Sequence, residues 1–207
     1  YLIAESLAKD FSLFPDVKQE EKPIAGLLSQ GEISRLHDHL VGLDIDAYIE
    51  TVVDNANDQS RVPAPEIIRK LGRVIEEESV GPYFQATITL DFGEGSARMV
   101  GFVAQDRSRE LGSWGPEHHL RAARFAERCS NRSLPMVTFM DTPGANAKEE
   151  ANANNQAHSI SRLIAEMSNL DVPSVGVIYG LGYSGGAIPL AASNMILSLR
   201  DGVFSTI

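Results

Sequence analysis

Cysteine is nearly absent from this sequence, in which Cys129 is the single thiol. One cysteine can form neither an intrachain disulfide nor a four-cysteine zinc site. Cys129 follows Ala122, Phe125 and Ala126 at helical spacing, which predicts a core position. A catalytic thiol is the alternative, but the sequence shows no base nearby. The scarcity of cysteine favours a reducing, cytoplasmic setting.

Long apolar runs are absent as well. No run approaches the roughly 20 residues that a membrane-spanning helix needs, and no signal-peptide pattern opens the sequence, so we expect no membrane partner. The sequence begins at Tyr1 rather than at a methionine and ends at Ile207 within an apolar run. We therefore interpret it as a segment of a longer polypeptide that is long enough to bury one sizeable core.

Positive charge is also scarce. The chain has 18 lysines and arginines against 28 acids, a net charge of −10, which argues against a nucleic-acid partner because phosphates require a basic surface. Residues 98–132 are the exception, with 7 arginines against 4 acids. This stretch predicts either a solvated helix face or an anion-facing patch for CoA phosphates or an acidic partner.

The first 80 residues show the apolar spacing of three and four that is typical of helices. Gly81-Pro82 then interrupts the chain, so we predict a helical N-terminal region over residues 1–80 and a second domain over residues 81–207. The acidic run Glu76-Glu77-Glu78 is interpreted as a solvated helix end. The predicted helices are Ile24–Leu40, Ile45–Val53 and Pro65–Ile75.

Beyond residue 81 the pattern alternates between strands and helices, which predicts an α/β fold with strands that lead into helix N-termini at one sheet edge. A turn over Phe92–Ser96 separates the first two strands. Strands are predicted at 83–90, 99–103, 136–140, 175–179 and 195–199, and helices at 116–130, 149–170 and 185–192.

Two glycine-bearing turns follow the two most apolar strands, at Asp141–Ala145 and Gly182–Ala187. Ligands of α/β sheets bind at the carboxyl ends of strands, where glycine allows close approach to the backbone. Free N–H groups at a helix start can stabilise an oxyanion, so Gly185 and Gly186 are the predicted catalytic donors. The alternative is a turn in which glycine merely permits close helix–strand packing.

Each turn also matches another signature. Asp141–Gly144 fits the D-x-x-G element of GTPases, but the chain has no lysine followed by serine or threonine, which a phosphate loop requires. The other role for Asp141 is a carboxylate that caps the turn beyond it. Gly182-x-Ser184-x-Gly186 matches the nucleophile elbow of serine hydrolases, yet no histidine follows Ser184. We therefore predict that Ser184 is a helix N-cap.

The histidines do not have metal-ligand spacing on a helix face, so no metal site is predicted. We expect surface positions for the two close pairs, His37 with His39 and His118 with His119. A helix surface is also favoured for His158, although this residue could face a site.

Residues from about 83 to 207 resemble the carboxyltransferase α subunit of bacterial acetyl-CoA carboxylase, a member of the crotonase-like superfamily. The matching stretches are Met136–Ala145, Ile164–Ser168, Val172-Pro173, Ser184–Ala187 and Phe204–Ile207, in that order. The resemblance implies a ββα-based spiral core. It also implies carboxyl transfer from carboxybiotin to the α-carbon of acetyl-CoA.

The resemblance further implies the roles of residues and partners. Gly185 and Gly186 would stabilise an oxyanion, and the surrounding site would be formed by Gly144, Ala145, Gly182, Tyr183 and Ser184. The CoA thioester would be the substrate, and the carboxybiotin would be carried on a separate biotin carboxyl carrier protein. A β-type carboxyltransferase subunit would complete the enzyme, so we expect an oligomer.

The sequence departs from the family pattern in the segment 146–155, and Leu181 and Tyr183 replace an expected glutamate and glycine. Tyr183 would narrow or re-aim the pocket. Two alternatives therefore stay open. One is a biotin-independent crotonase-like enzyme, such as a decarboxylase or hydratase, and the other is a non-catalytic paralogue.

Overall fold

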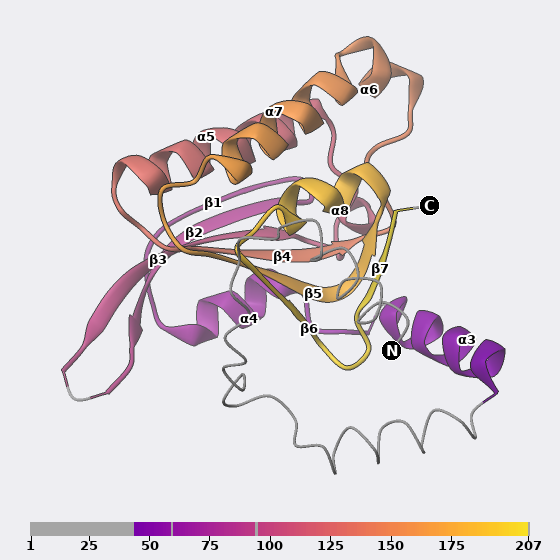
Figure 1. The fold of residues 1–207 in the computed structure, drawn as a ribbon, viewed down its shortest axis with the longest axis horizontal. Coiled ribbons are helices and arrows are strands. Elements are labelled where there is room, and N and C mark those ends of the chain that lie inside the picture. The colour runs from indigo at the N-terminus through magenta and orange to yellow at the C-terminus, as the bar shows by residue number, and fades with distance from the viewer. Residues whose placement is uncertain (1–43, 59, 94, 207) are drawn as a thin grey trace, which may run out of the picture. The chain divides into compact units, whose positions relative to one another are not determined.

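A sheet of seven strands forms the centre of the fold in the computed structural model, which describes residues 44–58, 60–93 and 95–206 (Figure 1). Six strands follow the order β1-β2-β3-β4-β5-β6, and β7 pairs with the C-terminal end of β5. The strands are β1 (Arg73–Val80), β2 (Tyr83–Asp91), β3 (Ala97–Gln105), β4 (Met136–Thr142), β5 (Ser174–Tyr183), β6 (Met195–Ser198) and β7 (Val203–Ser205).

The first three strands are antiparallel and the later pairings are parallel. Parallel neighbours need crossover connections, and helices supply them here. The helices are α3 (Ile45–Ala56), α4 (Ala64–Leu71), α5 (Pro116–Asn131), α6 (Glu149–Ala153), α7 (Gln156–Ser168) and α8 (Ser184–Ala191), with a short 3₁₀ helix η2 at Glu110–Gly112.

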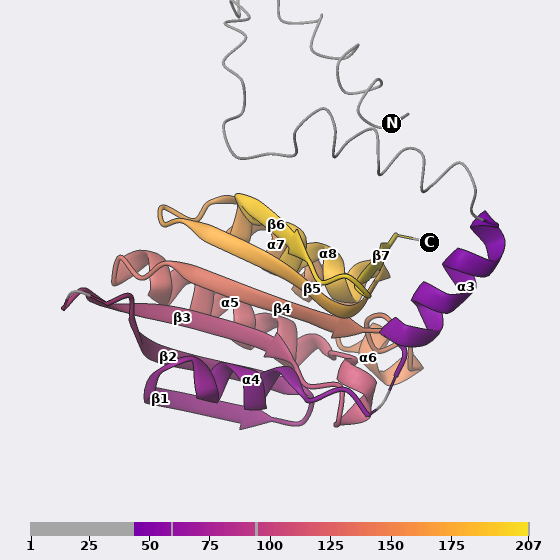
Figure 2. The same cartoon turned by 90° about the horizontal axis from the view of Figure 1, so that it is seen from below.

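Helices α5, α7 and α8 lie over one face of the sheet, and α4 lies on the other (Figures 1 and 2). Each face therefore buries its own cluster of apolar side chains. Trp114, Phe125 and Leu163 belong to the first cluster. Ile68 of α4 and Phe84 of β2 belong to the second. The predicted α/β architecture is confirmed, including the predicted strands and the helix that begins at Pro116.

The helical prediction is wrong for Arg73–Val80, which form strand β1. Helix α4 ends before Gly72, where an added Cβ would lie 2.3 Å from the Thr89 carbonyl oxygen of β2. Because glycine permits this close approach, the chain can begin to pair with β2 directly after α4. The acidic run is therefore part of an edge strand and not a helix end. The domain boundary after residue 80 stays a prediction, and Ile24–Leu40 lie outside the described residues.

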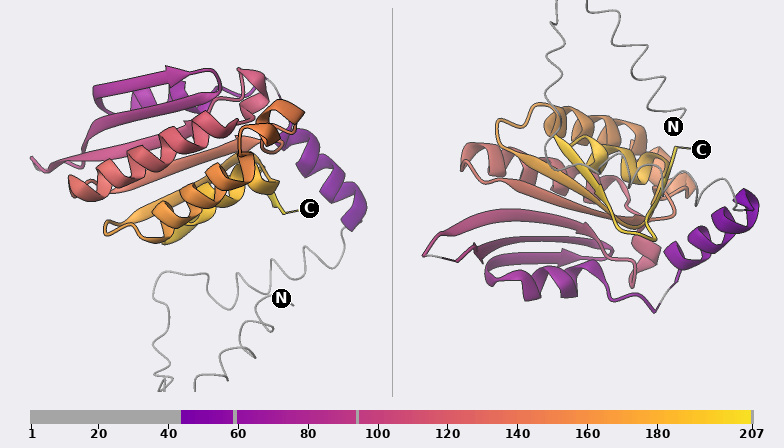
Figure 3. Two further views of the ribbon diagram at one scale, coloured as in Figure 1. Left: turned by 90° about the horizontal axis from the view of Figure 1, so that it is seen from above. Right: turned by 60° about the horizontal axis from the view of Figure 1, so that its bottom comes forward.

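The predicted helix at 149–170 is two helices, α6 and α7. The break lies at Asn155, whose φ of 64° is left-handed. Asparagine tolerates this conformation better than most non-glycine residues, because its short polar side chain can bond locally. The break separates the short helix α6 from the longer helix α7 (Figure 3).

Cys129 lies in the core, as predicted, with 1% of its surface exposed. Burial raises the pKa of its thiol to about 12. No helix in the described part of the chain is long and apolar enough to cross a bilayer.

Candidate functional site

The two glycine turns predicted from the sequence meet at the carboxyl edge of the sheet. A Cβ added to Gly186 would lie 2.6 Å from the Gly144 carbonyl carbon and 2.7 Å from the Ala145 nitrogen. Real side chains do not approach backbone this closely, so only glycine fits at position 186. Gly185 faces no such contact, because its added Cβ would meet only the end of the Ile160 side chain, at 3.2 Å.

A bulge between β4 and β5 sets the position of the second turn. Met140 pairs with Ile178 and Thr142 pairs with Gly182, so β5 advances four residues while β4 advances two. The Leu181 N–H in this bulge donates to the Asp141 carboxylate at 3.1 Å. Bulges redirect a strand, and this one leads β5 into the start of α8.

Gly182 and Tyr183 are the last residues of β5 rather than turn residues. Both pair with β7, Gly182 with Phe204 and Tyr183 with Ser205. A Cβ on Gly182 would lie 2.9 Å from the Phe204 ring, so this glycine serves the packing of two strands. Tyr183 is half-buried at the N-cap position of α8.

Ser184 is not the helix N-cap that the sequence predicted. It is the first residue of α8, and the N-cap residue is Tyr183. The Ser184 backbone is left-handed, with a φ of 53°, and its side chain is exposed. The side chain of the N-cap residue Tyr183 forms no capping hydrogen bond. The backbone conformation of Ser184, rather than its hydroxyl, therefore shapes the start of α8.

We predict that Ser184→Ala changes the rate of catalysis by less than about twofold, because the first-turn N–H groups are unchanged. Ser184→Gly is expected to raise the free energy of unfolding by up to about 1 kcal/mol, since glycine adopts a positive φ without strain. Steady-state kinetics and thermal unfolding of both variants measure these effects. Near-complete loss of activity in Ser184→Ala would instead identify a nucleophile.

Asp141 does not cap its own turn. Thr142 does so, because its hydroxyl accepts the Gly144 N–H at 3.2 Å. The Asp141 carboxylate is buried at 2% exposure and lies 3.6 Å from the Arg107 guanidinium. Burial raises its pKa to about 6, and the charge of Arg107 and the Leu181 N–H partly oppose this rise. Asp141 thus joins β4, β5 and the segment after β3.

Gln105 is a site residue that sequence reasoning missed. It is fully buried at the end of β3. Its side-chain amide donates to the Gly186 carbonyl at 2.7 Å, and its oxygen accepts the Asp141 N–H at 3.0 Å. A polar residue at the end of a predicted strand was the available signal, but its partners are 36 and 81 residues away in sequence.

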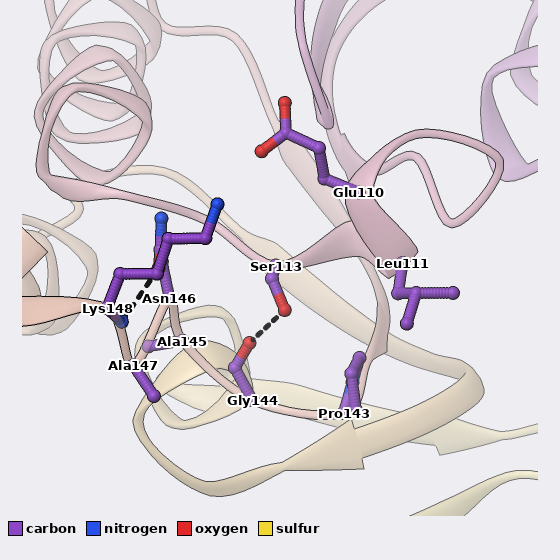
Figure 4. Close-up of a pocket in the computed structure, with 9 residues that line it drawn as sticks. All are labelled: Glu110, Leu111, Ser113, Pro143, Gly144, Ala145, Asn146, Ala147 and Lys148. Atoms are coloured by element: carbon purple, nitrogen blue, oxygen red, sulfur yellow. Dashed lines mark hydrogen bonds between the residues drawn. The ribbon is translucent and has the colours of Figure 1, made fainter.

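A pocket of about 700 Å³ lies beside the first glycine turn. Figure 4 shows its wall, in which Ser113 donates a hydrogen bond to the Gly144 carbonyl at 3.0 Å. Gly144 and Ala145 line this pocket, whereas the predicted residues of the second turn do not. The lining residues are Glu110, Leu111, Ser113, Pro143, Gly144, Ala145, Asn146, Ala147 and Lys148.

The opposite wall of the pocket has an unusual backbone. Glu110 and Leu111 have positive φ angles of 47° and 55°, and Gly112 follows at 75°. A Cβ on Gly112 would lie 2.1 Å from the Asp141 carbonyl oxygen, so the segment packs tightly against the end of β4. Such backbone conformations cost free energy and often occur at ligand sites. Leu111 nevertheless exposes 47% of its surface.

His118 and His119 are buried, so the surface prediction for them is wrong. The Nδ1 of His118 accepts the Gly115 N–H at 3.0 Å at the start of α5. His119 packs edge-on against Trp114 and is fully buried, which lowers its pKa to about 4. Burial also lowers the pKa of His118. His158 is exposed on α7, as favoured, while His37 and His39 lie outside the described residues.

Arginines of the basic stretch pair with the acids of β1. Arg132 lies 2.8 Å from Glu76, and Arg121 contacts Glu78. Neither arginine is therefore a free anion-facing charge. Across the described residues, no three of the side chains that bind metals gather into a candidate metal site.

Solved structures with similar folds include a transcarboxylase and a malonate decarboxylase. Transcarboxylase 12S with methylmalonyl-coenzyme A and methylmalonic acid bound matches with a TM-score of 0.62 and 17% identity, over 72% of this chain and 30% of that one. The malonate decarboxylase MdcD–MdcE heterodimer from Pseudomonas matches with a TM-score of 0.59 and 20% identity, over 70% and 65%. The fold is that of the crotonase-like carboxyltransferases, as predicted.

Residues 101–207, more than half of the chain, match the family described as acetyl co-enzyme A carboxylase carboxyltransferase-like. The chain belongs to this family. The acetyl-coenzyme A carboxylase carboxyl transferase subunit alpha of Brucella anthropi is 34% identical over 124 residues, which cover 56% of this chain and 39% of the relative. The protein of the same name from Brucella ovis gives the same values. The match thus spans well under half the length of these relatives.

Proposed function

We propose that this chain is an α-type carboxyltransferase subunit that transfers a carboxyl group from carboxybiotin to an acyl-CoA, with acetyl-CoA as substrate and malonyl-CoA as product. The observation that carries the proposal is the packing of Gly186, in the first turn of α8, directly against Gly144 and Ala145. This packing brings the N-terminus of a helix to the residues that line the pocket.

The first-turn N–H groups of an α-helix have no partner within the helix, and the helix dipole adds positive potential there. The N–H groups of Gly185 and Gly186 would donate to an oxygen that gains negative charge during the transfer. Loss of one such donor lowers kcat by about 10²–10³-fold in acyl-transfer enzymes. The backbone of α8, rather than a side chain, would therefore supply the catalytic interaction.

The residues present fit this chemistry. Carboxybiotin supplies the carboxyl group when it is bound. In the transfer its N–C bond would break and a C–C bond would form at the α-carbon of the acyl-CoA. The proton that leaves this carbon would go to the biotin nitrogen that has lost the carboxyl group. The pocket beside Gly144 is about 700 Å³, in the range of small-molecule sites, and Lys148 and Asn146 add polar groups to its wall.

The proposal includes partners. A β-type carboxyltransferase subunit would hold the acyl-CoA, and a biotin carboxyl carrier protein would deliver the carboxyl group, in a cytoplasmic oligomer. The relatives named as subunit alpha and the heterodimeric neighbour support an assembly of this kind.

Biotin-independent acyl-CoA chemistry is the second candidate, with decarboxylation as its simplest form. The segment that departs from the family pattern includes Asn146 and Lys148, which form part of the pocket wall. An altered wall of this kind could accommodate a different acyl group. The altered segment also leaves a non-catalytic role in assembly as the remaining alternative.

Biotin dependence separates these functions. The chain is mixed with a β-type subunit and malonyl-CoA, and the loss of the carboxyl group is measured with and without free biotin. The proposal expects loss that requires biotin and both subunits. Loss without biotin would support a decarboxylase, and no loss under either condition would support the non-catalytic role.

A further inference from the structure

We propose that Gln105 is a positioning residue that holds the first turn of α8 at the distance from β4 that catalysis requires. This inference rests on the proposed function, because it concerns the same backbone donors. Gln105 itself does not line the pocket. It acts through the two backbone segments that it joins.

The Gln105 side chain is a fully buried bridge between the two halves of the site. Its Nε2 donates to the Gly186 carbonyl at 2.7 Å in the first turn of α8. Its Oε1 accepts the Asp141 N–H at 3.0 Å at the end of β4, three residues before Gly144. The nitrogen and the oxygen of one side-chain amide thus form hydrogen bonds to two separate elements, α8 and β4.

A buried glutamine is held only when its polar atoms have partners, because burial without hydrogen bonds is costly. Here both bonds go to backbone groups of the site rather than to another side chain. The Gly186 carbonyl belongs to the peptide group that directly follows the Gly186 N–H, which is one of the two proposed donors. A fixed carbonyl therefore limits how far the first turn can rotate or slide.

A second buried side chain supplies a matched control at the other end of the same helix. The Thr138 hydroxyl of β4 donates to the Leu190 carbonyl at 2.8 Å, and Thr138 is also fully buried. It joins β4 to the last turn of α8, away from Gly185 and Gly186. Gln105→Met removes the bond to the Gly186 carbonyl and the bond from the Asp141 N–H, and Thr138→Val removes the bond to the Leu190 carbonyl. Both variants change the shape of the side chain little.

The experiment compares kcat and KM of the two variants and of the wild-type chain, assembled with a β-type subunit and supplied with carboxybiotin and acetyl-CoA. We expect Gln105→Met to lower kcat by about 10–100-fold with little change in KM, since small displacements of catalytic groups have effects of this size. We expect Thr138→Val to change kcat by less than about twofold, even where the two variants lose similar thermal stability. Equal kcat values for the two variants would overturn the inference.

Gln105→Glu provides a second test that does not depend on a stable Gln105→Met variant. An ionised carboxylate keeps an acceptor for the Asp141 N–H but has no donor for the Gly186 carbonyl, whereas the protonated acid can donate to it. Burial favours the protonated acid, so kcat relative to the wild type is measured as the pH rises. We expect the relative kcat of Gln105→Glu to fall toward that of Gln105→Met as the carboxyl group ionises. A relative kcat that stays at the wild-type value at every pH would show that the contact with Gly186 has no positioning role.

A spectroscopic measurement separates failure of this inference from failure of the proposed function. The amide resonances of Gly185 and Gly186 are recorded in a ¹⁵N-labelled chain. We expect them to shift in Gln105→Met and to remain in place in Thr138→Val, whether or not the wild-type chain transfers a carboxyl group. Unchanged glycine resonances in Gln105→Met would overturn the positioning role directly.

Discussion

Gly186→Ala is expected to abolish most carboxyl transfer, with kcat lowered by about 10²–10³-fold, the effect of losing one oxyanion donor. The added Cβ would lie 2.6–2.7 Å from backbone atoms of Gly144 and Ala145. Backbone cannot rotate away as a side chain can, so the first turn of α8 must move away from Gly144 and Ala145. Steady-state kinetics of the complex with a β-type subunit measure the loss.

Gly185→Ala is the matched control for this variant. Its Cβ would meet only the terminal carbon of the Ile160 side chain, at 3.2 Å, which a small rotation relieves. The N–H of residue 185 is retained, so kcat should stay within about threefold of the wild type. Full activity in Gly186→Ala would contradict the proposed site and would favour the non-catalytic role.

Arg107→Met is expected to destabilise the fold by about 3–5 kcal/mol at pH 8, because it removes the nearest charge that compensates the buried Asp141 carboxylate. Arg107 also contacts Asn57, so its removal loses a hydrogen bond to the segment that follows α3 as well. Urea unfolding of the wild-type and variant chains measures the difference in the free energy of unfolding.

The loss in Arg107→Met should shrink as the pH falls. The pKa of Asp141 in the folded chain is raised from 3.8 to about 6, so the folded state binds this proton more readily than the unfolded state. The carboxyl therefore contributes more stability as the pH falls from above 6 toward 4. Removal of the Arg107 charge raises the folded pKa further, and protonation at pH 5 should recover much of the loss.

The double variant Arg107→Met with Asp141→Asn tests the cause. It contains neither charge, so this pair should no longer contribute to the change of the free energy of unfolding between pH 5 and pH 8. A loss in Arg107→Met that is the same at pH 5 and pH 8 would show that the contact with Asn57, rather than the charge of Asp141, accounts for the effect.

Sequence reasoning predicted the strands and helices whose pattern is local. The apolar runs at 136–140 and 175–179 and the helix that begins at Pro116 were found where the apolar pattern predicted them. The error at Arg73–Val80 has a different origin. This edge strand has a charged, largely exposed surface, and its pairing with β2 determines its conformation. Periodicity within the segment does not contain that information.

The candidate site shows the same difference between features that follow from the local sequence and features that depend on distant residues. Gly186 and Gly144 could be selected from the sequence because each follows an apolar strand, and the structure brings them into contact. The bulge in β5 depends on its pairing with β4, and Gly182 and Tyr183 pair with β7, so the turn motif did not predict their positions. The motif did not predict the left-handed φ of Ser184 either. Gln105 was missed because its partners are distant in sequence.

Transfer of a labelled carboxyl group tests the central claim most directly. Carboxybiotin labelled with ¹⁴C in its carboxyl group is incubated with acetyl-CoA, a β-type subunit and this chain. The proposed function predicts ¹⁴C in malonyl-CoA, at a rate that Gly186→Ala lowers about 10²–10³-fold and Gly185→Ala leaves nearly unchanged. Label that stays out of malonyl-CoA with the wild-type chain, or that is transferred equally well by Gly186→Ala, would contradict it.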